Sequence, residues 1–144
     1  MSSFRQSALV PFSSAQMYSL VNDIELYPEF LPWCSRAKII ENSESQVNAE
    51  LTVSKGPFTY NFSTTNLLVP NKSIDLKLLK GPFKFFRGHW VFNDDSRGCF
   101  VRLSIDYEAS TPLLRMALSM ASGAVVDSLI KSFEFSPGRV AFTK

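Results

Sequence analysis

The sequence is poor in the residues on which most metalloenzymes depend, with one histidine and two cysteines among 144 residues. His89 alternates with Trp90 in a strand pattern and so faces away from it, which argues against a catalytic triad or a histidine-based metal site. Cys34 and Cys99 lie far apart without metal-ligand spacing, as is typical of reduced thiols in a cytosolic protein. These scarcities favour a protein that is not an enzyme and that holds no metal.

Charge and long apolar runs are also scarce. The formal net charge is only +2, which gives no strong field to attract nucleic acid by charge alone, and we expect no DNA partner. The longest uncharged apolar stretch, residues 116–126, is well short of the roughly 20 residues that span a bilayer. The first residues lack the apolar segment of a secretory signal. We therefore expect a cytoplasmic protein without a transmembrane segment, whose membrane contact, if it has one, is peripheral.

Bulky apolar residues, in contrast, are abundant. The chain contains 13 phenylalanines, 4 tyrosines and 2 tryptophans, and its hydrophobic share is 45%. A chain of 144 residues is near the usual size of one domain, so we expect a single domain over residues 1–144. So many rings indicate either an unusually aromatic core or a cavity lined for an apolar guest.

Hydrophobic periodicity predicts seven strands and two short helical segments. The strands are expected over residues 4–10, 37–40, 47–53, 58–64, 74–78, 86–92 and 99–107. Between the first two strands, Ser13 and Gln16 form a capping box that starts a short helix. A second helical turn over residues 24–27 follows, and we expect Pro28 and Pro32 to end it.

One long helix remains to cover this sheet. Thr111 caps it, Pro112 takes its first position, and it extends to about Phe133 or Phe135. Short connections favour antiparallel pairing, and a sheet of seven strands must twist and curl. The sequence therefore predicts an α+β helix-grip fold: a curved seven-stranded antiparallel sheet wrapped around the C-terminal helix, with two short helices after the first strand.

The C-terminal helix is apolar around most of its circumference and carries small residues in its middle. Gly123 costs about 1 kcal/mol against alanine in a helix interior. Together with Ala124 it leaves room to which the flexible Met116 and Met120 can adapt. This pattern predicts an apolar ligand site, lined from the sheet by Phe58, Tyr60, Phe62, Trp90 and Phe92. Close packing of helix on sheet is the alternative that the pattern leaves open.

An aromatic corner lies between the short helices and the next strand. Two prolines fix the path of the chain there, and the bulky side chains of the corner are those of Tyr27, Phe30, Leu31 and Trp33. In a helix grip this corner lies close to the mouth of the cavity. It either plugs the junction between helix and strand or forms an entrance lid for a ligand.

A cluster of basic residues surrounds the Gly81-Pro82 turn, and it consists of Lys77, Lys80, Lys84 and Arg87. A solvated sheet edge explains such a cluster, because edge lysines deter aggregation. Contact with ribosomal RNA is the alternative, and it would be sensitive to salt. Asp106 and Glu108 share a strand face that we expect to be wet, so tuning for acid–base chemistry is not expected there.

Four strings in the chain carry a family resemblance: Val-Asn-Asp at 21–23, Tyr-Pro-Glu-Phe-Leu-Pro-Trp-Cys at 27–34, Gly-Pro-Phe at 81–83 and Gly-His-Trp-Val-Phe at 88–92. They are similar to the START-related ubiquinone-binding and ribosome-association-toxin family of the polyketide cyclase/dehydrase superfamily. The order of elements fits this family from about Phe4 to Phe133. The residues after Phe135 depart from the family pattern.

The resemblance implies a START-like helix-grip fold and three roles. The mitochondrial branch implies non-catalytic binding of ubiquinone, and the bacterial branch implies binding to the large ribosomal subunit and a block of subunit joining. The superfamily name implies a polyketide cyclase-like enzyme, which the residues do not support independently. Our leading sequence-based hypothesis is the binding of ubiquinone or a related isoprenoid or lipid in support of respiratory quinone function. Action on the ribosome is the alternative.

Overall fold

The structure is a computed structural model that describes residues 2–30, 34–55 and 57–112. Of Phe30, Lys55 and Phe58 it describes the backbone alone. Pro112 is helical, in agreement with the predicted first position of the C-terminal helix. The rest of that helix lies outside the described residues, so the closure of the sheet on it stays a prediction.

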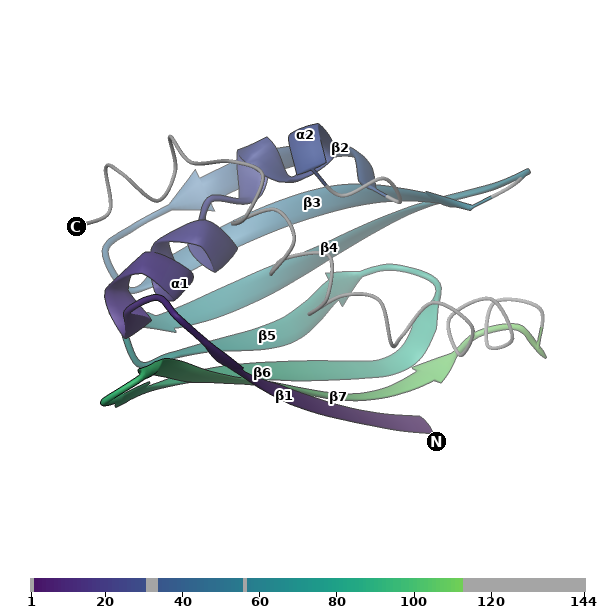
Figure 1. Cartoon of the computed structure of the whole chain (residues 1–144). Coiled ribbons are helices and arrows are strands. Elements are labelled where there is room, and N and C mark those ends of the chain that lie inside the picture. Colours follow the sequence, from purple (N-terminus) through teal and green to yellow (C-terminus); the bar gives the residue numbers. More distant parts are fainter. Residues whose placement is uncertain (1, 31–33, 56, 113–144) are drawn as a thin grey trace.

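Seven antiparallel strands of the described chain form one curved sheet in the order β1-β7-β6-β5-β4-β3-β2 (Figure 1). From β2 to β7 each strand pairs with the next in sequence, whereas β1 pairs with β7. The strands are β1 (Ser2–Val10), β2 (Cys34–Asn42), β3 (Gln46–Lys55), β4 (Phe58–Val69), β5 (Ser73–Lys80), β6 (Phe83–Asp95) and β7 (Gly98–Ala109). The predicted seven-stranded antiparallel sheet is confirmed, and every strand extends beyond its predicted bounds.

The helical segment after β1 comprises α1 (Ser14–Asn22), the 3-10 turn η1 (Ile24–Leu26) and α2 (Tyr27–Phe30). The predicted capping box is confirmed: the Gln16 amide donates to Ser13 Oγ at 3.1 Å, and the Ser13 amide donates to Gln16 Oε1 at 2.8 Å. The expectation that Pro28 ends the helical segment is wrong, because α2 continues through it to Phe30. Proline is tolerated in the first turn of a helix, where its missing N–H has no partner to lose.

The short helices pack on one side of the sheet (Figure 1). α1 contacts β6 and β7, whereas η1 and α2 contact β2, so the segment spans the sheet at one end. We call the face toward α1 the inner face and the opposite one the outer face. Alternate strand residues are buried on the inner face, where they pack with Met17, Leu20 and Val21 of α1; they include Val10, Ile74, Trp90, Phe92, Cys99, Val101 and Leu103.

The outer face is largely polar. His89 lies on it opposite Asp75 in the pairing of β5 with β6, and His89 Nδ1 is hydrogen-bonded to Asp75 Oδ1. This confirms that the histidine faces away from the buried Trp90 and shows that its ring has a structural partner. His89 therefore serves the surface pairing of two strands.

Candidate functional site

The β5–β6 turn at Gly81-Pro82 gathers the basic residues that the sequence singled out. Lys77 and Arg87 are direct cross-strand partners on the outer face. Lys80 ends β5, Lys84 follows the first residue of β6, and all four side chains are exposed. The turn is tied to the end of β7 by a hydrogen bond from the Ser110 amide to the Pro82 carbonyl at 2.9 Å. The four basic residues are thus exposed around one turn.

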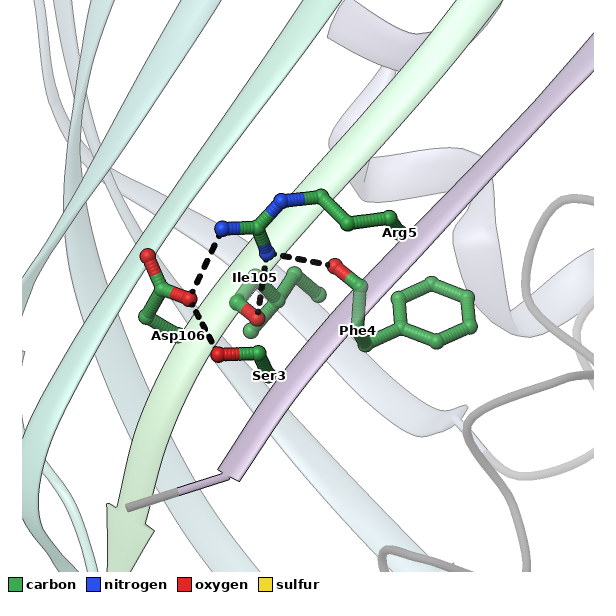
Figure 2. Close-up of polar contacts among 5 residues, drawn as sticks. All are labelled: Ser3, Phe4, Arg5, Ile105 and Asp106. Carbon is green, nitrogen blue, oxygen red and sulfur yellow. Dashed lines mark hydrogen bonds and ion pairs between the residues drawn. The ribbon is translucent and has the colours of Figure 1, made fainter.

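Acidic residues lie beside the basic cluster on the outer face, but they form no ion pair with it in the part of the chain that the structure describes. None of Lys77, Lys80, Lys84 and Arg87 forms an ion pair there. Asp106, which lies opposite Arg87 on β7, accepts hydrogen bonds from Ser3 at 2.8 Å and from Arg5 at 3.0 Å instead (Figure 2). Two hydrogen bonds hold the pKa of the Asp106 carboxyl below its usual value. The one from Ser3 has the larger effect, and the one from Arg5 comes second.

The pairing of Lys77 with Arg87 runs against the stability of the sheet. Like charges directly opposite each other on neighbouring strands are destabilising, and opposite charges in the same geometry are stabilising. The nearest acidic candidate on β7 is engaged by β1. The Lys77–Arg87 pair therefore costs stability and forms no ion pair in the described residues.

An aromatic cluster lies on the inner face below the same turn. The rings of Phe62, Phe83 and Phe86 form a triangle with centroid distances of 5.1, 5.3 and 5.6 Å, and Phe83 also contacts Tyr107 edge-on at 6.2 Å. The three phenylalanines are half-buried, whereas Tyr107 is buried. Such edge-to-face contacts are favourable beyond the burial of area. We call these four residues the inner aromatic cluster.

The sequence found one member of this cluster, Phe62, and missed the others. Phe83 and Phe86 are three positions apart in β6, so strict alternation places them on opposite faces. A β-bulge between Phe83 and Phe85 changes the phase and brings both rings to the inner face. The signal available in the sequence was the Gly-Pro-Phe string at 81–83.

The remaining predicted ligand residues fall into three groups. Trp90 and Phe92 are 5% and 3% exposed, and their parallel rings, 6.1 Å apart, belong to the hydrophobic core. Tyr60 is half-buried on β4 opposite Val53. The others lie outside the described residues or are described by their backbone alone: Phe30, Leu31, Trp33, Phe58, Met116, Met120, Gly123 and Ala124.

Tyr27 joins the two halves of the helical segment. Its hydroxyl donates a hydrogen bond to the carbonyl of Val21 near the end of α1, where helix carbonyls lack partners within the helix. Burial raises the pKa of Tyr27 above its usual value, and the nearby Cys34 and Asp23 raise it further. Tyr27 thus ties α2 to the end of α1, whereas Leu31 and Trp33 of the aromatic corner lie outside the described residues.

The Tyr27→Phe variant should be less stable at neutral pH by about 1 to 2 kcal/mol, because the Val21 carbonyl loses this donor. The raised pKa of Tyr27 contributes stability that is fully present below about pH 10 and is lost as the pH rises further. Urea unfolding at neutral pH and above pH 10 measures this effect. Between the two pH values the variant should lose less free energy of unfolding than the unchanged protein. Parallel pH profiles for the two proteins would contradict this role.

The two cysteines are free and buried, in agreement with the predicted reduced thiols. Burial raises the pKa of both thiols. Over residues 2–30, 34–55 and 57–112, no group of three or more His, Cys, Asp and Glu side chains could hold a metal ion. No helix among these residues is long and apolar enough to cross a membrane.

The fold and the residues of this chain are those of a known family. Residues 10–134 match the family described as polyketide cyclase/dehydrase and lipid transport, and the chain belongs to it. The match confirms the family recognised from the four strings. A START superfamily protein from Mycobacterium smegmatis is similar in structure, with a TM-score of 0.75, 21% identity and 99% of both chains covered. The Zhui aromatase/cyclase from Streptomyces sp. R1128 gives a TM-score of 0.82 at 14% identity, with 92% and 93% covered.

The curated relatives narrow the comparison within this family. The ribosome association toxin RatA of Pseudomonas aeruginosa is 38% identical over 90% of this chain and 90% of its own length. RatA of Vibrio cholerae is 40% identical over 89% of this chain and 90% of its own. The mitochondrial coenzyme Q-binding protein COQ10 homolog B of Xenopus laevis is 25% identical over 95% of this chain and 58% of that protein.

Proposed function

We propose that this protein acts on the ribosome, binding the large subunit and blocking its association with the small one. The observation that carries the proposal is the exposed Lys77–Arg87 pair, which forms no ion pair in the described residues. The basic cluster around it matches the charge of ribosomal RNA. The names of relatives at 36–40% identity support the same role. Ribosome action is therefore our first proposal, ahead of the binding of ubiquinone or a related lipid that was the leading sequence-based hypothesis.

Sucrose-gradient profiles of ribosomes mixed with the purified protein test this proposal. We expect free subunits to increase at the expense of joined ribosomes as protein is added at low magnesium and moderate salt. The effect should weaken as salt rises, because phosphate contacts release counterions. An unchanged balance of subunits and joined ribosomes at every protein concentration would contradict the proposal. A protein that acts on ribosomes in this way would act in the cytoplasm.

Binding of an apolar molecule is the second candidate, and the inner aromatic cluster favours it. Three half-buried phenylalanines on the concave side of the sheet offer a surface for an isoprenoid or another lipid. The name of the Xenopus relative supports a quinone as one such ligand. Neither role needs catalysis, and the curated relatives are named for binding and toxicity, so we propose a protein that is not an enzyme.

The Phe86→Ala variant should retain less apolar ligand than the unchanged protein, because it removes the ring that contacts both Phe62 and Phe83. Native mass spectrometry after purification, with added ubiquinone as the probe, measures the bound fraction. Phe100→Ala is the matched control, since Phe100 is an exposed ring on the outer face. If neither protein binds ubiquinone or a co-purified lipid, this second candidate fails.

A further inference from the structure

Two β-bulges flank the Gly81-Pro82 turn. In the β4–β5 ladder the partners pass from Thr64↔Leu78 to Ser63↔Lys80, which leaves Leu79 without a partner position. In the β6–β7 ladder they pass from Phe83↔Ala109 to Phe85↔Glu108 and skip Lys84. Bulges re-aim side chains at the ends of strands and are features of function more often than accidents of pairing.

The second bulge separates two rings that alternation would place together. Phe83 joins the inner aromatic cluster, whereas Phe85 lies opposite Glu108 on the outer face and is 40% exposed. Leu79 is 49% exposed at the other bulge. Among the described residues Phe85 makes no ring–ring contact, unlike Phe83 and Phe86 beside it. Phe85 therefore lies outside the inner aromatic cluster.

Phe85 has Glu108 directly opposite it on β7 and basic residues along β6 and β5. Arg87 is its neighbour on the same face of β6, two positions along the strand, and Lys77 lies opposite Arg87. Lys80 and Lys84 complete the surface at the turn. An exposed ring beside cationic side chains on the face of a sheet is the arrangement that proteins use for unpaired bases, with the ring stacked on a base and the cations against the flanking phosphates.

We propose that this outer surface, made of Phe85, Leu79 and the four basic residues, binds a single-stranded segment of RNA. Phe85 stacks on one unpaired base, and Lys77 and Arg87 contact phosphates next to it. The proposal rests on the proposed ribosome function and names the kind of RNA that this function engages. A strand-borne ring that is more than half covered suits stacking on a base better than insertion among lipid chains.

Fluorescence anisotropy with a short fluorescein-labelled oligoribonucleotide of mixed sequence tests the stacking directly. Phe85→Ala should weaken binding by about tenfold, since one base–aromatic stack is worth that much. Phe85→Trp should bind as well as the unchanged protein, because it keeps an aromatic face. Phe100→Ala is the matched control: its ring is 43% exposed on the same face, at the opposite end of the strands. The same RNA annealed into a duplex should bind equally well to the unchanged protein and to Phe85→Ala, because its bases are already paired and stacked.

Three outcomes separate this inference from its alternatives. Equal binding by Phe85→Ala and Phe100→Ala would overturn base stacking, even where the unchanged protein splits ribosomes in the gradient. A protein that leaves the gradient unchanged contradicts the ribosome function, while the oligonucleotide titration still decides whether Phe85 stacks. Co-sedimentation with phosphatidylglycerol vesicles that is lost in Phe85→Ala, with RNA binding unaltered, would overturn the proposal in favour of a membrane surface.

Discussion

The double variant Lys77→Gln, Arg87→Gln is expected to lose its effect on ribosome association while it folds normally. Two exposed positive charges disappear from the centre of the basic cluster, so binding to the large subunit should weaken by more than about tenfold. The slope of log affinity against log salt should fall by about 2, one for each lost phosphate contact. Relief of the like-charge pair should leave the free energy of unfolding unchanged or slightly higher.

The matched control is Lys72→Gln, Arg102→Gln, which removes the same amount of charge at the other end of the sheet. Lys72 lies in the β4–β5 turn, and both side chains are exposed. If only net charge mattered, the two double variants would bind the large subunit equally weakly. Sedimentation with purified large subunits at several salt concentrations distinguishes them, and equal loss would contradict a defined contact surface at the Gly81-Pro82 turn.

Gly98→Ala is expected to destabilise the protein more than any surface substitution, by about 3 kcal/mol or more. Gly98 starts β7 with φ +141°, a conformation that residues with a side chain rarely adopt. A Cβ atom there would lie 1.9 Å from the carbonyl oxygen of Val10 and 2.9 Å from the Cα of Pro11. Both are backbone atoms at the end of β1, so relief of the clash requires β1 to separate from β7.

Gly88→Ala supplies the comparison for this effect. A Cβ on Gly88 would lie 2.9 Å from Leu76 Cδ1, the far end of a flexible side chain that can move aside. Gly88→Ala should lower the free energy of unfolding by about 1 kcal/mol, as for a small overpacking of the core. Urea unfolding followed by tryptophan fluorescence measures both variants. Similar midpoints for the two would contradict the assignment of Gly98 to a backbone contact between β1 and β7.

Much of the fold could be predicted because each strand has one face that is buried from solvent. Val47 and Ala49 are buried while their neighbours on β3 are not, and this difference is what period-two alternation records. The capping box could also be predicted, because Ser13 and Gln16 have the spacing that their reciprocal hydrogen bonds require. Pro28 was misread because proline both ends helices and begins them, and only its position within α2 decides between the two.

The site was harder to predict than the fold, because a bulge changes the phase of alternation by one residue and leaves no reliable mark in the sequence. Phe85 was therefore passed over, and Phe83 could not be placed beside Phe86. Trp90 and Phe92, which the sequence predicted as ligand contacts, lie in the buried core of the described residues, and their contact with a ligand stays a prediction. The exposure of the four basic residues, in contrast, could be predicted, because residues around a tight turn lie at the surface whatever the register of the strands.

The pairing of β1 with β7 has a consequence for the synthesis of the chain. The hydrogen bond from Ser3 to Asp106 joins residues 103 positions apart, and the whole β1–β7 ladder is comparably long-range. During synthesis β1 must therefore wait for β7, its only neighbour among the described strands. Contacts of such long range slow folding, and β1 is an unpaired template for other chains in the meantime. We expect the nascent protein to become resistant to proteolysis only after β7 has emerged.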